Sequence, residues 1–214
     1  MIGVVVVALV SYISGAIPFS YIAGKAFGGI DLRDHGSGNL GATNTFRFLG
    51  VKIALLVLAA DIAKGFLPVF FAPAYSLGHT IPDLWLMYIG GFFAVIGHMF
   101  SLFMRFKGGK GIATTAGVFL ALAPAAFLGA LVVFVVVFGA TRIVSVASMV
   151  SSIALPVMVY ITQRIGWVPG DRSLLILSFA ITVVVLVKHH SNIRRLMSGT
   201  EPALRRHRPG DYGE

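Results

Sequence analysis

The sequence predicts an all-α integral membrane protein with seven transmembrane helices. Three observations support this fold class: 57% of the 214 residues are hydrophobic, only 12% are charged, and long apolar runs recur along the chain. Each run is roughly 20 residues long, which is enough to cross the hydrocarbon core of a bilayer. Soluble domains carry about 25% charged residues. We therefore expect a single polytopic membrane domain that covers residues 1–214.

Five of the spans are apolar runs with polar residues on both sides. They cover residues 2–24, 53–73, 84–104, 144–162 and 173–188. The first run has no Lys or Arg before it and no clear small-x-small cleavage site after it. It is also longer than the core of a signal peptide, so we interpret it as a retained span.

The run over residues 112–140 is too long for one comfortable span, and Pro124 interrupts it. It forms either one kinked helix or two short helices, 112–123 and 125–140. The number of crossings here decides on which side of the membrane the basic C-terminal tail lies.

The distribution of Lys and Arg favours two crossings. With two crossings, the loops 25–52 and 105–111, Arg142 and the basic tail all share one side, which leaves Arg164 and Arg172 on the other. Lys and Arg accumulate in cytoplasmic loops. The sequence thus predicts seven spans, with the N-terminus outside and the C-terminus in the cytoplasm.

Composition also excludes several kinds of site. The chain has no cysteine, so it has no disulfide, no thiolate metal ligand and no thiol nucleophile. Its six histidines are scattered and accompany no carboxylate-rich cluster, so we expect no metal site. The formal net charge of +9 is explained by the cytoplasmic loops and tail, and it does not indicate nucleic acid.

The first polar cluster is "DLRDHGSGNLGATNTFRFLG", residues 31–50. Gly36, Gly38 and Gly41 can adopt positive φ, which lets backbone N–H groups converge on an anion. A helix that begins near Thr43 would add the pull of its N-terminal dipole. The side-chain donors are Ser37, Asn39, Thr43, Asn44 and Arg47. A merely flexible loop is the alternative, but the density of donors favours phosphate binding.

The second polar cluster is "RFKGGKGIATTAG", residues 105–117. It is a glycine-rich turn that leads into a helix N-terminus and carries two ammonium groups. The turn consists of Lys107, Gly108, Gly109, Lys110 and Gly111. It lacks the G-x-x-x-x-G-K-S/T pattern, so no nucleotide is indicated. Taken alone, a cytoplasmic loop with two topology-setting lysines explains it better than a binding site.

The third polar cluster is "VKHHSNIRRLMSGTE", residues 187–201, where the last span leaves the bilayer. His189, Asn192 and Arg195 have the spacing of one helix face. The histidine could act as a general base or as a hydrogen-bond donor. Cationic capping of a helix C-terminus remains an equal alternative.

Polar side chains also lie within the predicted spans. Asp61 and Lys64 are three residues apart in the second span, where they are expected to form a structural ion pair that faces the bundle interior. Ser145 and Ser148 lie just inside the span after Arg142. They could bind a ligand phosphate or bond back to their own helix.

Together the motifs "GSGNLGATN…R", "GHMFSLFMRFKGGKGIAT" and "HHSNIRRLMSG" resemble the three signature motifs of the bacterial acyl-phosphate:glycerol-3-phosphate acyltransferases, the PlsY type. The resemblance covers nearly the whole chain. It implies an enzyme of the bacterial cytoplasmic (inner) membrane whose active site faces the cytoplasm. Such an enzyme moves a fatty acyl group from acyl phosphate to the sn-1 hydroxyl of glycerol 3-phosphate. The products are 1-acyl-glycerol 3-phosphate (lysophosphatidic acid) and phosphate, in phospholipid synthesis.

The resemblance also implies roles for single residues, with membrane lipids as surroundings and no metal or other cofactor. Ser37, Lys110, His189 and Asn192 match the catalytic positions, and Glu201 matches an acidic residue with a more structural role. The implied substrate- and phosphate-binding residues are Asn39, Thr43, Asn44, Arg47, Lys107, Gly108, Gly109, Gly111 and Ser148. Ser101 is a departure, since family members often have Pro there.

A membrane transporter for an organic phosphate is the alternative function. It would need a path to the outside face, and its polar machinery would more often lie near the bilayer midplane. The predicted outer loops offer only Arg164 and Arg172 as cations. The basic extension "ALRRHRPGDYGE" carries no motif, and it is suited to anionic headgroups.

Overall fold

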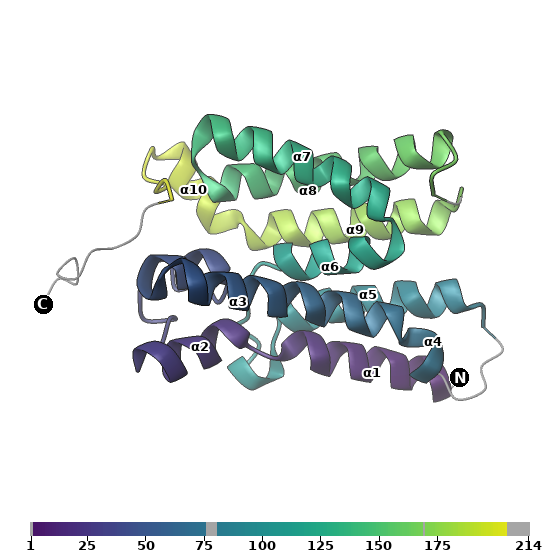
Figure 1. Cartoon of the computed structure of the whole chain (residues 1–214), viewed down its shortest axis with the longest axis horizontal. Coiled ribbons are helices and arrows are strands. Elements are labelled where there is room, and N and C mark those ends of the chain that lie inside the picture. Colours follow the sequence, from purple (N-terminus) through teal and green to yellow (C-terminus); the bar gives the residue numbers. More distant parts are fainter. Residues whose placement is uncertain (1, 76–80, 169, 205–214) are drawn as a thin grey trace, which may run out of the picture.

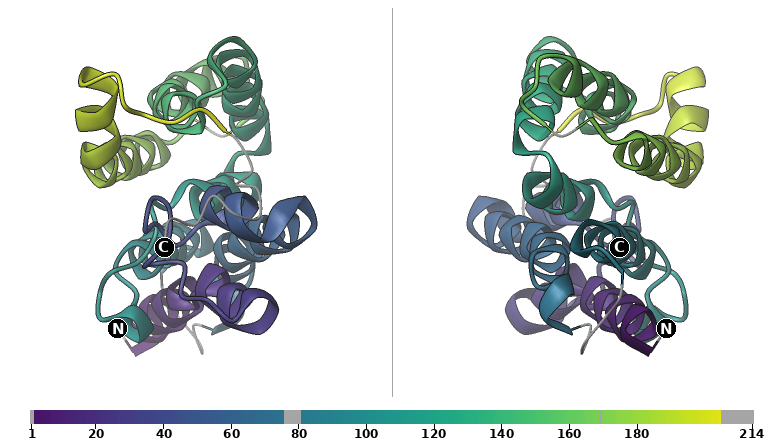
Figure 2. Two further views of the ribbon diagram at one scale, coloured as in Figure 1. Left: turned by 90° about the vertical axis from the view of Figure 1, so that its left-hand side faces the viewer. Right: turned by 90° about the vertical axis from the view of Figure 1, so that its right-hand side faces the viewer.

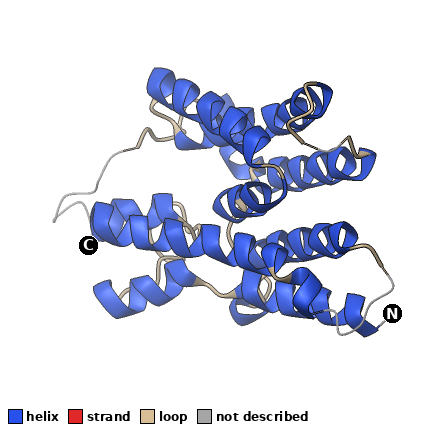
Figure 3. Ribbon diagram, turned by 45° about the vertical axis from the view of Figure 1, so that its right-hand side comes forward, coloured by secondary structure: helices blue, strands red, loops and turns tan. Residues whose placement is uncertain are grey.

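A computed structural model describes residues 2–75, 81–168 and 170–204 of the chain. Every regular element in these residues is helical (Figure 3), as the sequence predicts. The elements are α1 (Ile2–Ala16), α2 (Phe19–Gly28), α3 (Ala42–Phe70), α4 (Ala72–Tyr75), α5 (Asp83–Met99), the 3-10 helix η1 (Leu102–Met104), α6 (Ile112–Leu122), α7 (Pro124–Thr141), α8 (Val144–Arg164), α9 (Arg172–Lys188) and α10 (His190–Met197). Most of the basic extension lies outside the described residues.

The long helices run along one axis in two groups, with the short helix α6 between them (Figures 1 and 2). One group contains α1, α2, α3 and α5, and the other contains α7, α8 and α9. Helix α1 packs on α5, α3 packs on α6, and α7 packs on α8. Because α6 contacts α3, α5 and α7, it connects the two groups.

Glycines allow the closest of these helix contacts. A Cβ atom at Gly15 of α1 would collide with the carbonyl group of Ala94 in α5. A Cβ atom at Gly65 of α3 would collide with the carbonyl group of Thr114 in α6. Helices in membranes lack a hydrophobic drive to associate, so close backbone approach through small residues supplies van der Waals contact instead.

The helical segments have the length and composition of membrane spans. Five segments are long and apolar enough to cross a bilayer, and the bent pair α9 and α10, with a 56° bend, makes a sixth candidate in the described chain. Helix α7 exposes Val132, Val135 and Val136, each at more than half of its surface. An apolar helix surface of this kind is typical of a helix that faces membrane lipid.

Two separate helices occupy residues 112–140. Helix α6 ends at Leu122, Ala123 leaves the helical conformation, and Pro124 is the first residue of α7. At 1.5 Å per residue the 11-residue α6 is about 16 Å long, roughly half of a hydrocarbon core. It cannot cross alone, so the seventh crossing and the orientation of the termini stay predictions.

The first predicted span, 2–24, is not one continuous helix. It breaks at Ile17 and Pro18, where α1 ends and α2 begins. Proline has no N–H group to continue the helical ladder and its ring clashes with the preceding turn. The break leaves the carbonyl group of Ile17 available to a side chain from another helix.

One other predicted boundary also differs from the structure. The span predicted over 53–73 begins at Ala42 instead, and helix α3 is kinked at Gly50, whose φ is 80°. The span predicted over 84–104 agrees with the candidate span Asp83–Met104, in which α5 ends at Met99 and η1 follows. Helix α3 therefore includes the second half of the first polar cluster.

The polar segments gather at one end of the bundle, on the left in Figure 1. The C-terminal end of α2, the beginning of α3 and the whole of α10 lie there. We call this the polar end. Helix α4 and the turn after α8 lie at the opposite end.

Candidate active site

The polar end contains an open cleft of about 1060 Å³ between the two helix groups. Its walls come from six parts of the chain: the loop and helix at 36–61, His98 of α5, residues 110–113 at the start of α6, Phe134 and Phe138 of α7, the start of α8, and the segment from His189 to Leu204. Residues from all three polar clusters, far apart in sequence, therefore face one space. The predicted site residues among its lining are Ser37, Asn39, Thr43, Asn44, Arg47, Lys110, Gly111, Ser148, His189 and Asn192.

The loop before α3 is held by a single amide side chain. Buried Asn44 accepts hydrogen bonds from the amide and the hydroxyl of Ser37, at 3.2 and 3.3 Å. Its own amide group donates to the carbonyl oxygens of Leu32 and His35, both at 3.0 Å. Asn44 was expected to be a ligand donor, but its donors are already used within the protein. It is a brace that fixes Ser37 at the mouth of the cleft.

The glycines of this loop differ in conformation. Gly36 and Gly38 have φ values of 60° and 64°, as predicted for a loop that turns its amides inward. Gly41 is instead extended, with φ −168°, and is the residue before α3. The expectation of positive φ at Gly41 is therefore wrong. Its carbonyl group begins the helix by accepting from the amides of Asn44 and Thr45, each at 3.1 Å.

The beginning of α3 presents donors to the cleft. Thr43 and Arg47 are four residues apart and both line it, so they lie on the same helix face. Arg33 and Arg195 each form an ion pair with a carboxylate, at 2.6 and 2.7 Å. Within the part of the chain that the structure describes, Arg47 forms no such pair. An unpaired guanidinium beside a helix N-terminus is an anion-binding arrangement.

The second cluster contributes less to the cleft than the sequence suggests. Lys107 is exposed and does not line it. The amide groups of Gly108 and Gly109 donate to the carbonyl oxygens of Met99 and His98, at 3.2 and 3.1 Å. These two glycines are thus not available as amide donors to a phosphate. They hold the loop on the end of α5, and Lys110 and Gly111 continue into the cleft.

A chain of hydrogen bonds joins the two halves of the molecule across the cleft. The ammonium group of Lys110 donates to Oδ1 of Asn192 at 2.5 Å. Asn192 in turn donates through Nδ2 to Oε1 of Glu201 at 2.6 Å. Lys110 precedes α6 and Asn192 lies on α10, so this contact fixes the relative position of the second and third clusters.

Glu201 is the acceptor at the centre of this network. Besides Asn192, the hydroxyl of Ser145 donates to its Oε1 at 2.5 Å, and Nε of Arg195 donates to its Oε2 at 2.7 Å. Sequence reasoning left open whether Ser145 binds ligand and did not place Arg195 among the site residues. Both line the cleft. The spacing of Arg195 from Asn192, three residues along α10, was the available signal.

The charges of this network shift the pKa values of its members. Burial lowers the pKa of Lys110 to about 8, against the opposing pull of the Glu201 carboxylate. The neighbouring Arg195, Arg47 and Lys188 lower it further. Hydrogen bonds from Ser145, Asn192 and Arg195 outweigh burial and lower the pKa of Glu201. Glu201 is therefore an anion and Lys110 is mostly an ammonium ion at neutral pH.

The break between α9 and α10 positions His189. Its Nδ1 lies 2.8 Å from the carbonyl oxygen of Val185, so Nδ1 carries the proton and donates. Nε2 of the neutral ring then holds a lone pair on a residue that lines the cleft. Ser148, one turn into α8, is buried at the same wall.

An apolar surface continues the cleft away from the charged groups. Val51, Leu55 and Leu58 of α3 form one side, and Phe134 and Phe138 of α7 form the other. Leu55 is 57% exposed and Val51 is 55% exposed, so the α3 side faces outward. The cleft is therefore amphipathic: cations line one part of it, and an apolar groove lies between α3 and α7.

The arrangement fits an anion better than a metal ion. In the described residues, no group of three or more His, Cys, Asp or Glu side chains gathers as metal ligands would. Among the residues that the structure describes, three cations, Arg47, Lys110 and Arg195, line the cleft with one carboxylate, Glu201, and with Asp61, which is paired elsewhere with Lys64. The surplus of positive charge can hold phosphate groups, and the groove can hold a hydrocarbon chain.

The chain is similar to known proteins in both sequence and fold. The family model described as glycerol-3-phosphate acyltransferase matches residues 5–199. A glycerol-3-phosphate acyltransferase of Trichlorobacter lovleyi is 45% identical over 192 residues, which cover 89% of this chain and 92% of the relative. The enzyme of that name from Fusobacterium nucleatum is 43% identical over 193 residues, with 90% and 94% covered.

Two solved structures have the same fold. The crystal structure of PlsY, an integral membrane glycerol 3-phosphate acyltransferase, in its glycerol 3-phosphate form superposes with a TM-score of 0.83 at 33% identity. This similarity covers 94% of the present chain and 96% of that chain. The lysophosphatidic acid form gives a TM-score of 0.80 at 32% identity, with 94% of both chains covered.

Proposed function

The chain belongs to the glycerol-3-phosphate acyltransferase family, and we propose that it transfers a fatty acyl group from acyl phosphate to the sn-1 hydroxyl of glycerol 3-phosphate. The products are 1-acyl-glycerol 3-phosphate (lysophosphatidic acid) and inorganic phosphate. The reaction belongs to bacterial phospholipid synthesis. The observation that carries this proposal is the amphipathic cleft, which combines three cations with an apolar groove.

The two parts of the cleft suit the two ends of the donor. The phosphate of acyl phosphate is attracted by Lys110, Arg47 and Arg195, and the acyl chain lies in the groove between α3 and α7. Glycerol 3-phosphate brings a second phosphate group into the same space. Two phosphates of like charge repel each other, so the positive surplus is what allows them to be held side by side.

Acyl phosphate is a mixed anhydride, so it needs no covalent activation by the enzyme. The sn-1 oxygen attacks the acyl carbon, the bond between that carbon and the phosphate oxygen breaks, and phosphate departs with the bonding electrons. Holding the hydroxyl and the acyl carbon in the right geometry lowers the barrier by several kcal/mol, roughly 7 to 11 in the best cases. Donors aimed at the developing oxyanion contribute further.

We assign roles from the contacts. Ser37, held by Asn44, and Asn192, held by Glu201, orient the reacting groups. Lys110 and Arg47 bind phosphate. Nε2 of His189 is placed to receive the hydroxyl proton, because the bond from Nδ1 to Val185 leaves its lone pair free. The departing phosphate is the alternative proton acceptor, and it is already negatively charged.

The proposed orientation places the polar end in the cytoplasm of a bacterial cell, at the inner membrane. Lys25, Arg47, Lys110 and Arg195 belong to segments at this end, whereas Arg164 and Arg172 border the turn at the opposite end. Retention of Lys and Arg on the cytoplasmic side supports this choice. Glycerol 3-phosphate, a soluble substrate, then reaches the cleft from the cytoplasm.

The test is turnover by the purified protein in detergent. Given acyl phosphate and glycerol 3-phosphate, it should release lysophosphatidic acid and phosphate in equal amounts, and acyl-coenzyme A should not replace acyl phosphate. Turnover with acyl-coenzyme A alone would contradict the proposed donor. Binding of glycerol 3-phosphate without any turnover would instead support a transporter.

A further inference from the structure

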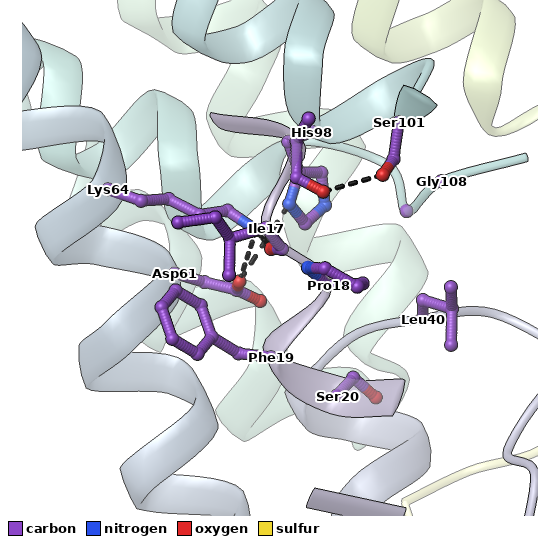
Figure 4. Close-up of a pocket in the computed structure, with 12 residues that line it drawn as sticks. Ile17, Pro18, Phe19, Ser20, Leu40, Asp61, Lys64, His98, Ser101 and Gly108 are labelled. Carbon is purple, nitrogen blue, oxygen red and sulfur yellow. Dashed lines mark hydrogen bonds and ion pairs between the residues drawn. The ribbon is translucent and has the colours of Figure 1, made fainter. Parts of the chain in front are cut away.

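A second group of polar side chains is buried beside the cleft (Figure 4). Asp61 of α3, Lys64 of α3 and His98 of α5 are 2%, 5% and 7% exposed, respectively. We call them the buried charged cluster. Asp61 and His98 line both the cleft and a second, small cavity of about 10 Å³, so the cluster lies in the wall between them.

The cluster is bonded to the break between α1 and α2. Nζ of Lys64 lies 2.6 Å from Oδ1 of Asp61 and donates to the carbonyl oxygen of Ile17 at 2.8 Å. Nδ1 of His98 is 3.8 Å from the same Asp61 oxygen. Lys64 thus joins α3 to the break after α1, and the Asp61 carboxylate lies beside His98 of α5 at a distance longer than a hydrogen bond. The predicted structural ion pair between Asp61 and Lys64 is confirmed, and His98 is an addition to it.

His98 is also the contact surface for the glycine-rich loop. The carbonyl group of His98 accepts the amide of Gly109 at 3.1 Å. A Cβ atom at Gly109 would collide with Nε2 of the His98 ring and with the carbonyl oxygen of Leu40, in the first polar cluster. The His98 ring, Gly109 and Leu40 therefore meet without spare space. Lys110 is the next residue along the chain.

We propose that the buried charged cluster is the positioning device for Lys110: the pair of Asp61 and Lys64 supports His98 from behind, and the His98 ring fixes the glycine-rich loop that carries the Lys110 ammonium group. This inference rests on the proposed function, in which Lys110 binds phosphate. The three residues are positioning residues, since they act through Lys110 and Gly109 and take no part in the acyl transfer itself.

Physical reasons favour a positioning role over stabilisation alone. A buried ion pair gains little net stability, because removing both charges from water costs about as much as their attraction returns. Correct placement of a binding group, by contrast, has a large effect on rate, since an error of about 1 Å costs on the order of 100-fold. A loop of small residues has little rigidity of its own and needs such a rigid support.

The test is a double-mutant cycle between His98 and Lys110, in the full-length protein in detergent. His98→Ala should lower kcat/KM for glycerol 3-phosphate by about 10- to 100-fold when Lys110 is present. In the Lys110→Met background the same change should lower the residual kcat/KM by less than about twofold, since there is no ammonium group left to misplace. Labelled glycerol 3-phosphate makes the residual rate measurable over long incubations.

A second variant covers the possibility that His98→Ala does not fold. His98→Asn keeps a polar group near the position of Nδ1, facing Asp61, but removes the Nε2 edge that contacts Gly109. It should show the same dependence on Lys110. Tyr88→Phe is the matched control: it also lies on α5, is buried, and loses one hydrogen bond, to Asp171. It should change kcat/KM less than about twofold in both backgrounds.

Each outcome has one meaning. If His98→Ala or His98→Asn lowered kcat/KM by the same factor in both backgrounds, the positioning role would be overturned. An unchanged kcat/KM would overturn it as well. Thermal denaturation of each variant separates loss of folded protein from loss of rate. If the wild-type protein itself produced no lysophosphatidic acid, the proposed function would fail instead.

Discussion

The molecule holds charge in two neighbouring places, and the two differ in balance. In the buried charged cluster, the Asp61 carboxylate is matched by the Lys64 ammonium group 2.6 Å away, and both are almost completely buried. In the cleft, within the described part of the chain, Arg47, Lys110 and Arg195 share one available carboxylate, Glu201. The comparison teaches that the charges of the buried pair neutralise each other within the fold, whereas the surplus cations of the cleft are neutralised only when anions bind.

The largest expected effect comes from removing a cation of the unbalanced set. Arg47→Met should lower kcat/KM by about 100- to 1000-fold, because one preorganised donor to phosphate is lost in the transition state. The folded stability should change little, since no ion pair of Arg47 is broken within the described chain. Steady-state kinetics and thermal denaturation in detergent measure the two quantities.

Lys52→Met is the matched control for this change. Lys52 lies five residues further along α3, is exposed, and does not line the cleft. Its replacement should change kcat/KM less than about twofold, as an ordinary surface substitution would. Equal losses from both variants would mean that cations act by general attraction and not by contact.

Removing one partner of the balanced pair should affect folding. Lys64→Met leaves the Asp61 carboxylate buried without its cation, which should lower the free energy of unfolding by about 3–5 kcal/mol. The double variant Asp61→Asn with Lys64→Met removes both charges and should regain a large part of that loss. Denaturation in mixed micelles measures the free energies of unfolding of the wild type, the single variant and the double variant. A double variant less stable than Lys64→Met would contradict this expectation, because the unpaired Asp61 charge would then not be the cause of the loss.

Replacing Glu201, the carboxylate of the network in the cleft, should have an effect of intermediate size on kcat/KM. Glu201→Gln keeps the shape but removes the charge that accepts from Ser145, Asn192 and Arg195. Hydrogen bonds to charged groups contribute about 1.5–3 kcal/mol, so kcat/KM should fall about 10- to 150-fold. Measured KM values for both substrates would show whether Asn192 is displaced. Unchanged kinetics would exclude Glu201 as its support.

The smallest effect expected is that of pH on the wild-type protein. Lys110 binds phosphate as an ammonium ion, and burial lowers its pKa to about 8. Its charge is present below that pH and is lost as the pH rises through it, so kcat/KM should fall about tenfold between pH 7 and pH 9. A Lys110→Arg variant should lose this alkaline limb, because a guanidinium stays protonated. An alkaline limb that persists in Lys110→Arg would assign it to another group.

Local sequence patterns were enough to predict much of the fold and part of the candidate site. Helix α3 begins at Ala42, beside the predicted Thr43, and Gly36 and Gly38 have the predicted positive φ. Asp61 and Lys64 are one helical turn apart, so their pairing follows from helix geometry alone. In each case the deciding interactions lie within a few residues along the chain.

The features that were missed depend on contacts between distant residues. Gly109 looked like a phosphate-binding glycine, but its amide and its lack of a side chain serve the packing on His98. Asn44 looked like a ligand donor, but the carbonyl groups it satisfies come from a loop nine and twelve residues away. A sequence shows which groups can donate. Only the folded chain shows which donors remain unused.

The central claim is that the positively charged cleft holds both phosphate-bearing substrates at the same time. It is tested most directly by the initial-rate pattern with both substrates varied. If the cleft holds the two phosphates together for direct transfer, reciprocal plots against acyl phosphate at several fixed concentrations of glycerol 3-phosphate should intersect. Parallel lines are the kinetic sign of a covalent acyl-enzyme. Intersecting lines are the expected result, and parallel lines with acyl groups trapped on Ser37 would contradict it.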